Sequence, residues 1–274
     1  MQSETRKTVK KVGFISPPAW FDISPTEFLR VAPDCIAVMQ TIMRLPDFKY
    51  DQAGFINAVP ELGNCFESLA AAGADVVAQF GYPFALVHGW ENAQQIQKQI
   101  QGNSSAQFLM MGVEIVQALR YMKCKTIAVA STYYSAKTAQ MLANYLLEAG
   151  FTIAQSDNWQ SLNLAQDDGT GMFIGGEDLD PMDWQTPVSA VQQAVRDVVK
   201  KAPGVDGILV TGGGMRLLDI VEELEKETST IIIGGDISIY WGILRRLKPK
   251  EGIRGYGKLL ASLDQFVDHS GLIH

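Results

Sequence analysis

The residues best suited to chemistry form a glycine-rich segment in the second half of the chain. A short apolar run leads into Thr211, and Gly212, Gly213 and Gly214 follow it. Glycines at the end of a strand let backbone N–H groups approach an anion closely. A helix is expected directly afterwards, over 216–224, and its N-terminus would add positive partial charge. The segment predicts half of a site for a small carboxylate or phosphate, although a tight turn without a ligand would have the same pattern.

Three further strand ends could complete such a site. The residues that follow the other apolar runs are Pro17-Pro18, Gly81-Tyr82 and Thr132-Tyr133. Ligands of open α/β sheets bind where strands end and helices begin. Threonine and tyrosine hydroxyls there can donate to a bound oxyanion, and two prolines form a rigid wall. Ordinary strand exits have similar compositions, so a purely structural role stays open.

Asp236 is the leading candidate for an acid or base. It follows two glycines at the end of an apolar run, and a buried carboxyl group beside apolar side chains can stay protonated and act as an acid. An N-cap of the next helix is an equally weighted alternative. His88, water, and the hydroxyls of Tyr82 and Tyr133 are further candidates, although tyrosine has an ordinary pKa near 10.

The composition argues against several classes of function. The 274 residues carry a net charge of −7 and no basic stripe, so nucleic acid is not an expected partner. Apolar residues make up 47% of the chain, which suits a large core, but no apolar run is long enough for a membrane span. Cys35, Cys65 and Cys124 are odd in number and lack metal-type spacing, and we expect no metal or cofactor. The polar N-terminus lacks a signal-peptide pattern, so a cytoplasmic protein is expected.

Alternating strand and helix patterns predict an α/β protein with parallel sheets. The expected strands are 12–16, 36–43, 74–80, 108–111, 126–130, 151–154, 207–210 and 230–233. The expected helices are 25–30, 52–72, 90–101, 113–122, 137–148, 189–201, 216–224, 238–246 and 258–267. Such long irregular stretches as 158–187 are usually lids, insertions or contact segments.

The pattern repeats once along the chain. We therefore expect two Rossmann-like lobes related by pseudo-twofold symmetry, with the active site in the cleft between them. The first lobe is expected to comprise 12–122 together with 238–274, and the second lobe 123–237.

The strand ends resemble those of the aspartate/glutamate racemase superfamily, and within it the branch of arylmalonate decarboxylase and maleate isomerase. The resemblance covers roughly 12–260. The segments that carry it, in order, are Gly13–Pro18, Gly73–Val77 with Gly81, Ala128–Tyr133, Asp206–Gly214, Trp241 and Gly255–Gly257.

The resemblance implies a carboxylate site but also reveals a departure. The family uses one or two catalytic cysteines, at most one in each half, and each stands at the later strand end of its half. The matching positions here are Gly81 and Gly212. Both thiols are missing, so cysteine-dependent racemisation or isomerisation is not expected. The resemblance implies that Tyr133, Thr211 and the backbone of Gly212 and Gly213 would hold a carboxylate and the enediolate formed from it.

The sequence thus predicts a cofactor-independent lyase that decarboxylates a substituted malonate-type or related small carboxylate. The predicted catalytic residues are Tyr133, Thr211 and Asp236. The predicted substrate-binding residues are Pro17, Pro18, Gly81, Tyr82, Thr132, Gly212, Gly213 and Gly214. The alternatives are an isomerase, hydratase or hydrolase that uses Asp236 or a tyrosine as acid or base, and a non-catalytic carboxylate-binding protein. Assembly into a homo-oligomer is left open.

Overall fold

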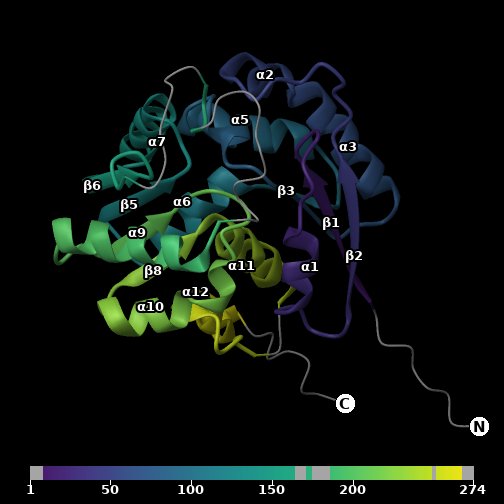
Figure 1. Ribbon diagram of the computed structural model, residues 1–274. Coiled ribbons are helices and arrows are strands. Elements are labelled where there is room, and N and C mark those ends of the chain that lie inside the picture. The colour runs from purple at the N-terminus through teal and green to yellow at the C-terminus, as the bar shows by residue number, and fades with distance from the viewer. Residues whose placement is uncertain (1–8, 164–170, 175–185, 249–250, 267–274) are drawn as a thin grey trace, which may run out of the picture.

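The protein contains two four-stranded parallel sheets with helices on their faces (Figure 1). This computed structural model describes residues 9–163, 171–174, 186–248 and 251–266. The strand order is β2-β1-β3-β4 in one sheet and β6-β5-β7-β8 in the other. The second sheet therefore repeats the strand order of the first, and the predicted α/β architecture of two parallel-sheet lobes is confirmed.

The bounds of the elements follow the predicted alternation closely. The first half forms β1 (Lys10–Ser16), α1 (Ser24–Leu29), β2 (Ile36–Ile42), α2 (Gln52–Asn57), α3 (Val59–Ala71), β3 (Val76–Gln79), α4 (Pro83–Leu86), α5 (Trp90–Gln101), β4 (Gln107–Met110) and α6 (Met111–Tyr121). The second half forms β5 (Thr126–Thr132), α7 (Ala136–Glu148), β6 (Thr152–Asn158), α9 (Val188–Lys201), β7 (Gly207–Val210), the 3₁₀ turn η1 (Leu217–Asp219), α10 (Val221–Thr228) and β8 (Ile231–Gly234). The chain continues with α11 (Gly235–Leu247), α12 (Gly257–Ala261) and η2 (Ser262–Phe266).

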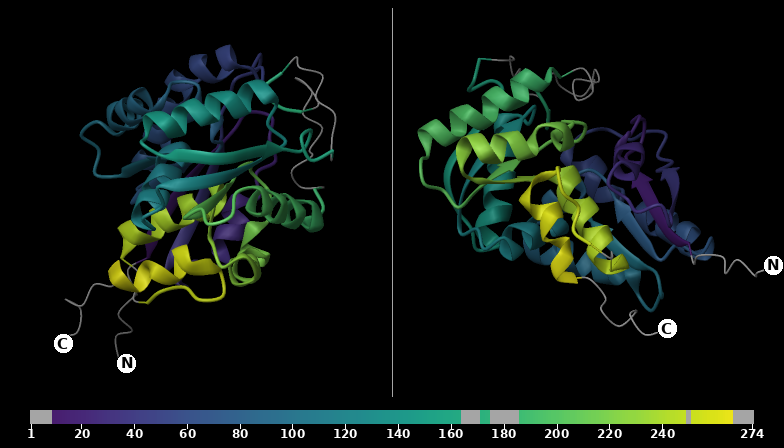
Figure 2. Two further views of the ribbon diagram at one scale, coloured as in Figure 1. Left: turned by 90° about the vertical axis from the view of Figure 1, so that its left-hand side faces the viewer. Right: turned by 90° about the horizontal axis from the view of Figure 1, so that it is seen from below.

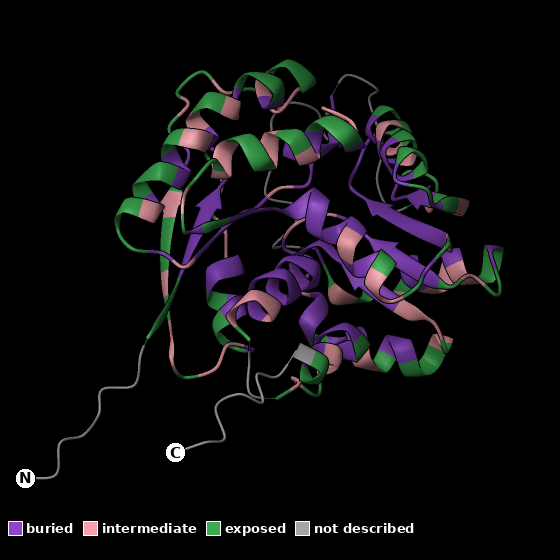
Figure 3. Ribbon diagram, turned by 180° about the vertical axis from the view of Figure 1, so that it is seen from behind, coloured by how far each residue is buried: buried purple, intermediate pink, exposed green. Residues whose placement is uncertain are grey.

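One central strand in each sheet is buried along its whole length. Every residue of β3 and of β7 is buried, as expected for parallel strands that are covered on both faces. Figure 3 shows this buried interior and the exposed outer surfaces of the surrounding helices. Close packing needs small residues at some points. A Cβ atom on Gly13 of β1, for example, would lie 2.9 Å from Leu69 Cδ1 of α3.

An aspartate fixes the start of the central strands in the same way in each half. Asp75 Oδ2 accepts the Lys11 N–H at 2.8 Å, and Asp206 Oδ2 accepts the Thr126 N–H at 2.8 Å. Both aspartates directly precede the inner strands β3 and β7 and hold the first residues of β1 and β5. These matching contacts agree with the repeated strand order.

α11 lies between the two sheets and contacts both (Figure 2). It packs on α6, β3 and β4 of the first half and on β8 of the second half. The carboxylate of Glu114, buried on α6, accepts hydrogen bonds from Arg245 and Arg246 of α11 at 2.9 Å each. α12, in contrast, packs on α10 and β8 as well as on α11. The proposed division into 12–122 plus 238–274 and 123–237 stays a prediction.

The structure corrects two predicted helices. The helix expected over 216–224 is wrong, because Arg216 has a left-handed backbone with φ +49°, η1 follows, and α10 begins only at Val221. No helix N-terminus therefore directly follows the three glycines. The helix expected over 52–72 is interrupted at Ala58. Pro60 lies in the first turn of the second helix, α3, and lacks the N–H that would continue the first helix, α2. Of the stretch 158–187, residues 164–170 and 175–185 lie outside the described residues.

Candidate functional site

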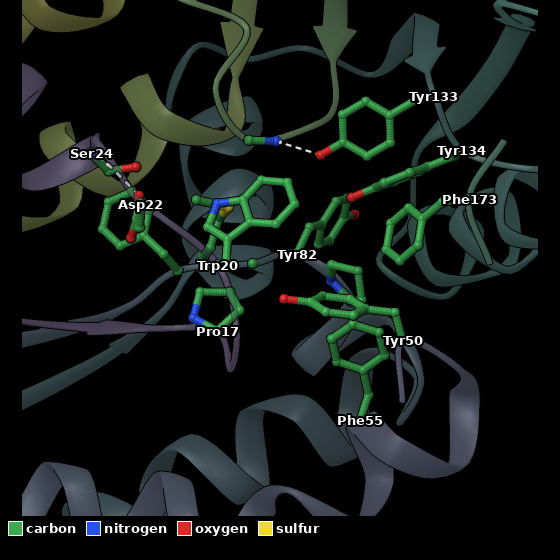
Figure 4. Close-up of a pocket in the computed structure, with 15 residues that line it drawn as sticks. Pro17, Trp20, Asp22, Ser24, Tyr50, Phe55, Tyr82, Tyr133, Tyr134 and Phe173 are labelled. Carbon is green, nitrogen blue, oxygen red and sulfur yellow. Dashed lines mark hydrogen bonds between the residues drawn. The ribbon is translucent and has the colours of Figure 1, made fainter. Parts of the chain in front are cut away.

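One cavity lies where the carboxyl ends of strands from both sheets meet (Figure 4). Its volume is about 50 Å³. Its lining comprises Pro17, Trp20, Asp22, Ser24, Tyr50, Phe55, Phe80, Gly81, Tyr82, Pro83, Met111, Tyr133, Tyr134, Phe173 and Gly213. Residues that follow β1, β3, β4, β5 and β7 thus share one small space, as expected for a ligand site of parallel sheets.

The structure divides the predicted site residues into two groups. Those that line the cavity are Pro17, Gly81, Tyr82, Tyr133 and Gly213. Those outside its lining are Pro18, Thr132, Thr211, Gly212, Gly214 and Asp236. The two threonines instead tie β5 to β7, because Thr132 Oγ1 donates to the Thr211 carbonyl at 2.8 Å and Thr211 Oγ1 lies 3.5 Å from the Ala130 carbonyl. Both of these side chains are buried among the strands.

Asp236 lies behind the cavity wall in the first turn of α11, where Gly234 is the N-cap. It is 4% exposed, and its charge is one cause of the raised pKa values of Tyr134 and Tyr240. A carboxylate in the first turn of a helix is favoured by the helix dipole. The structure therefore gives this residue a place near the tyrosines but not in contact with the cavity.

Tyr133 joins the ends of β5 and β7 across the cavity. Its hydroxyl accepts the N–H of Gly213 at 2.9 Å (Figure 4). The ring is held by Tyr134, Trp159 and Phe173, with centroids 5.5 to 5.8 Å away. A phenol that accepts a hydrogen bond keeps its own O–H as a donor. This pair therefore supplies a fixed donor at the point where the sequence predicted an anion site.

Gly212 makes this close arrangement possible. Its φ is +97°, and a Cβ atom there would lie 2.8 Å from both Thr132 Oγ1 and Tyr133 Cε1. An L-amino acid would be strained at this φ and would displace the Tyr133 ring. Gly81, at the end of β3, has a similar φ of +101°. Both positions predicted to match the family's cysteines therefore have backbones that favour glycine.

Tyr82 lines the cavity from the first half of the chain, and its hydroxyl is buried. The residue is 2% exposed, and its hydroxyl has no hydrogen-bond partner among the described residues. Burial raises its pKa well above the ordinary value, with smaller contributions from Tyr145 and Tyr134. Burial also raises the pKa of the neighbouring Tyr134, with a further effect of the Asp236 charge. Both phenols therefore stay neutral near pH 7 and remain hydrogen-bond donors.

Asp22 is a cavity residue that the sequence reasoning missed. Its Oδ2 accepts the Ser16 hydroxyl at 2.7 Å and its Oδ1 accepts the Ser24 N–H at 2.9 Å. Gln40 in turn donates to the Ser16 hydroxyl at 2.8 Å. Asp22 lies five residues after Pro17, in a loop that also carries Trp20. No local sequence pattern marks this loop position as part of the cavity.

The other reactive residues considered from the sequence do not line the cavity. His88 lies shortly after the end of α4 and outside the cavity lining, and burial lowers its pKa. None of the three cysteines is in the lining, and burial raises the pKa of both Cys65 and Cys124 to about 11. Such thiols stay protonated and unreactive near neutral pH. In the part of the chain that the structure describes, no group of three His, Cys, Asp or Glu side chains could hold a metal ion, and no helix is long and apolar enough to cross a membrane.

Only some of the large apolar residues near the strand ends line the cavity. Trp20 and Met111 line the cavity. Phe14, Phe84 and Met110 are buried core residues instead, and Phe21 is 80% exposed. The described parts of 158–187 also contribute, because Phe173 lines the cavity and packs on Tyr133 and Tyr134.

Several solved structures share this fold. A liganded double variant of arylmalonate decarboxylase, with one glycine replaced by cysteine and one cysteine by serine, is 20% identical with a TM-score of 0.77, over 92% of this chain and 98% of that one. Maleate cis-trans isomerase from Nocardia farcinica, as a cysteine-to-serine variant with a covalently bound succinylcysteine intermediate, is 20% identical with a TM-score of 0.76, over 93% and 99%. Maleate isomerase Iso from Pseudomonas putida S16 is 15% identical with a TM-score of 0.76, over 93% and 99%.

The sequence comparisons give the family. No curated protein matches the sequence. The sequence model of the arylmalonate decarboxylase family, however, matches residues 12–260. This range contains both sheets, apart from Lys10 and Lys11 of β1, and every described residue that lines the cavity. The fold, the cavity at the strand ends and this match lead to one conclusion: the chain belongs to the arylmalonate decarboxylase family.

Proposed function

We propose that the protein is a cofactor-independent decarboxylase of a small substituted malonate-type acid. The observation that carries this proposal is the Tyr133 hydroxyl, which is fixed by the Gly213 N–H at 2.9 Å in a cavity with largely aromatic walls. A malonate-type acid contains its own electron sink, because its second carboxylate takes up the electrons of the broken bond. The protein then has to stabilise charge and deliver a proton.

In the proposed reaction the bond between the central carbon and the departing carboxylate breaks, and CO₂ leaves. The electron pair of that bond moves into the remaining carboxylate and forms an enediolate. Tyr133 donates its hydroxyl proton as a hydrogen bond to one enediolate oxygen, and the Gly213 N–H strengthens that donor by polarising the phenol. Donors fixed before the charge develops are an effective form of transition-state stabilisation.

Aromatic side chains form most of the remaining wall. They include Trp20, Tyr50, Phe55 and Phe173. An apolar wall removes water from the carboxylate that leaves, whereas the donors around Tyr133 favour the carboxylate that stays. This difference between the two ends of the cavity would favour the loss of CO₂ over simple binding.

Tyr82 is the proposed proton donor to carbon. Its hydroxyl is buried, without a partner among the described residues, and belongs to the half of the chain opposite Tyr133. Its raised pKa keeps the proton in place at neutral pH, and an enediolate is basic enough at carbon to accept it. The phenolate would then recover a proton from solvent. Protonation from one fixed side chain predicts a single stereochemical outcome.

The test is a screen of purified protein with substituted malonates in D₂O, in which CO₂ and the product are followed by NMR. We expect CO₂ release with one deuterium on one face of the product. Tyr133→Phe is expected to lower kcat more than tenfold. Tyr82→Phe is expected to lower kcat and to give racemic product, whereas Tyr145→Phe, which removes a buried hydroxyl outside the cavity lining, is expected to leave both unchanged.

A second candidate is acid–base chemistry, such as hydration or isomerisation of a small carboxylate. The observation in its favour is Asp22, a carboxylate within the cavity lining. Solvent oxygen or solvent hydrogen would enter the product without release of CO₂. Binding of carboxylates without any turnover would instead support a non-catalytic protein.

A further inference from the structure

The charge of the cavity is unusual for a site that binds a carboxylate. Among the described residues that line it, Asp22 is the only one with a formal charge, and no lysine or arginine is present. A substrate with two carboxylates would therefore meet a negative side chain and no positive one. Tyr133 and Tyr82 can act on the reacting end of such a substrate, but they do not explain why the Asp22 carboxylate is also part of the lining.

The position of Asp22 is well fixed. The Ser16 hydroxyl and the Ser24 N–H each donate to one of its oxygens, and Gln40 donates to Ser16 and to the Asp22 carbonyl. Within the described residues Asp22 has no ion-pair partner. Each carboxylate oxygen can still accept a further hydrogen bond. A half-buried carboxylate that is held in place without a positively charged partner favours a ligand that carries a cationic group.

Aromatic rings surround the space beside this carboxylate. Figure 4 shows Trp20 between Asp22 and the tyrosines, and Trp20 and Tyr50 lie with ring centroids 6.3 Å apart. The faces of tryptophan and tyrosine rings attract cations, and such rings recur in sites for ammonium groups. The carboxylate and the rings thus favour the same kind of ligand group.

We infer that the substrate carries an ammonium or similar cationic group on its substituent, which Asp22 and the face of Trp20 bind. This inference rests on the proposed function for the reacting end of the substrate, where Tyr133 holds the carboxylate that stays and Tyr82 protonates the carbon. The substrate class becomes an amino-substituted or aminoalkyl-substituted malonate. Decarboxylation converts it to the corresponding amino acid and CO₂, with one proton taken up at carbon.

Binding can be tested separately from turnover. Calorimetry on the purified 274-residue chain would compare ω-amino acids of increasing chain length with straight-chain acids that have a methyl group in place of the ammonium group. None of these ligands has a second carboxylate to lose. We expect at least one amino acid to bind about tenfold or more tightly than its methyl counterpart, and we expect Asp22→Asn to abolish that preference.

The matched control is Asp75→Asn. Asp75 also accepts a backbone N–H, at the opposite end of the same sheet and outside the cavity, so the preference should survive its substitution. If Asp22→Asn does not fold, as judged by thermal melting, Trp20→Leu tests the same preference through the ring. A preference that is absent in the natural protein, or that survives both Asp22→Asn and Trp20→Leu, overturns the inference.

Turnover distinguishes this inference from the proposed function. The second assay compares CO₂ release from aminoalkylmalonates and from the matched alkylmalonates, with an expected ratio of kcat/KM of about ten or more. Equal turnover of both classes overturns the ammonium inference and retains the decarboxylase. If ammonium ligands bind more tightly but neither class of malonate releases CO₂, the ammonium inference is retained and the decarboxylase function is overturned. If neither aminoalkyl nor alkyl compounds bind, the ammonium inference and the decarboxylase function are both overturned.

Discussion

The ends of β3 and β7 occupy the same place in two sheets of equal strand order, yet they present different groups to the cavity. β3 leads through Phe80 to Gly81-Tyr82, and Pro83 begins a short helix at once. β7 leads through Thr211 to three glycines, and α10 does not begin until Val221. The first end offers a side-chain hydroxyl. The second offers a backbone N–H, which Gly213 donates to Tyr133.

The difference teaches where the chemistry of this fold is encoded. Strand order brings the two ends together, whereas the few residues after each strand decide which donors they carry. Both ends share a glycine with φ near +100°, so the sharp turn is common to them and the donor is not. The predictions below, in order of decreasing effect, test whether this distinction is real.

The largest effect is expected from Gly212→Ala. A new Cβ atom would lie 2.8 Å from Thr132 Oγ1 and from the Tyr133 ring, on a backbone with positive φ. We expect a loss of about 2–4 kcal/mol in the free energy of unfolding, measured by urea denaturation. Gly81→Ala meets Phe84 and Pro17 only at 3.1 to 3.3 Å, so its expected loss is smaller, about 1–3 kcal/mol.

Gly213→Ala is the control for these two substitutions. A Cβ atom there has no neighbour within 4 Å among the described residues, and its φ is not positive. The change in stability should stay within about 0.5 kcal/mol, although the new methyl group lies in the cavity lining and should raise KM. Equal losses at all three glycines would show that the two strand ends do not differ as described.

The next effect is expected from the two tyrosines. Tyr133→Phe leaves the Gly213 N–H without its acceptor and should cost about 1 kcal/mol in the free energy of unfolding. Tyr82→Phe removes a buried hydroxyl without a partner among the described residues, so it should be neutral or should stabilise by up to about 1 kcal/mol. Urea denaturation of both variants measures the difference.

Tyr145→Phe should behave like Tyr82→Phe, because its hydroxyl is also buried without a described partner. A stable Tyr82→Phe protein with lower turnover would mean that this hydroxyl is kept for a ligand. Equal destabilisation by Tyr82→Phe and Tyr133→Phe would contradict the distinction between the two ends.

Alkaline pH should sharpen the same comparison. Burial raises the pKa of Tyr82 in the folded chain above its value near 10 in the unfolded chain. Below about pH 10 Tyr82 keeps its proton in both the folded and the unfolded chain, so this residue causes no loss of stability there. Above it the unfolded chain releases the proton first, so stability falls by about 1.4 kcal/mol per pH unit for this group. Tyr82→Phe should make the decline shallower by that amount in urea titrations up to about pH 11.

The other buried groups act as an internal control, because Tyr145, Tyr240, Cys65 and Cys124 have raised pKa values in both proteins. They contribute the same slope with and without Tyr82. An unchanged slope in Tyr82→Phe would mean that the Tyr82 proton is not retained by the folded chain.

The sequence predicted the fold well because the fold depends on periodicity. Continuous apolar runs gave β3 and β7, and a polar, glutamine-rich stretch gave the surface helix α5 at its observed bounds, Trp90–Gln101. The apolar spacing over 52–72 predicts one helix, whereas Pro60 marks the break between α2 and α3. Arg216 adopts a left-handed backbone that residue type alone does not favour, and the helix after the glycines was therefore placed too early.

The site was predicted only in part, because the direction of a side chain depends on packing. Tyr133 and Tyr82 lie where the strand ends suggested, but Thr132 and Thr211 turn toward each other and bridge two strands. Asp236 was judged by its position after β8, whereas α11 begins one residue before it and draws it into the core. Asp22 required knowledge that the loop after β1 turns back over the cavity, which no local pattern encodes.

The smallest effect is expected where the two halves meet at the surface. Arg30, in the C-cap of α1, donates to Asp219 of η1, and their side chains are 41% and 45% exposed. Because solvent screens such a pair, Arg30→Gln should cost no more than about 1 kcal/mol in the free energy of unfolding, and less at high salt. Lys201→Gln is the matched comparison, because Lys201 is equally exposed but its partner Asp157 is only 5% exposed and would be left buried without its cation. Urea denaturation at low and high salt should therefore show the larger loss for Lys201→Gln. The opposite order would contradict the conclusion that the buried partner makes the difference between the two ion pairs.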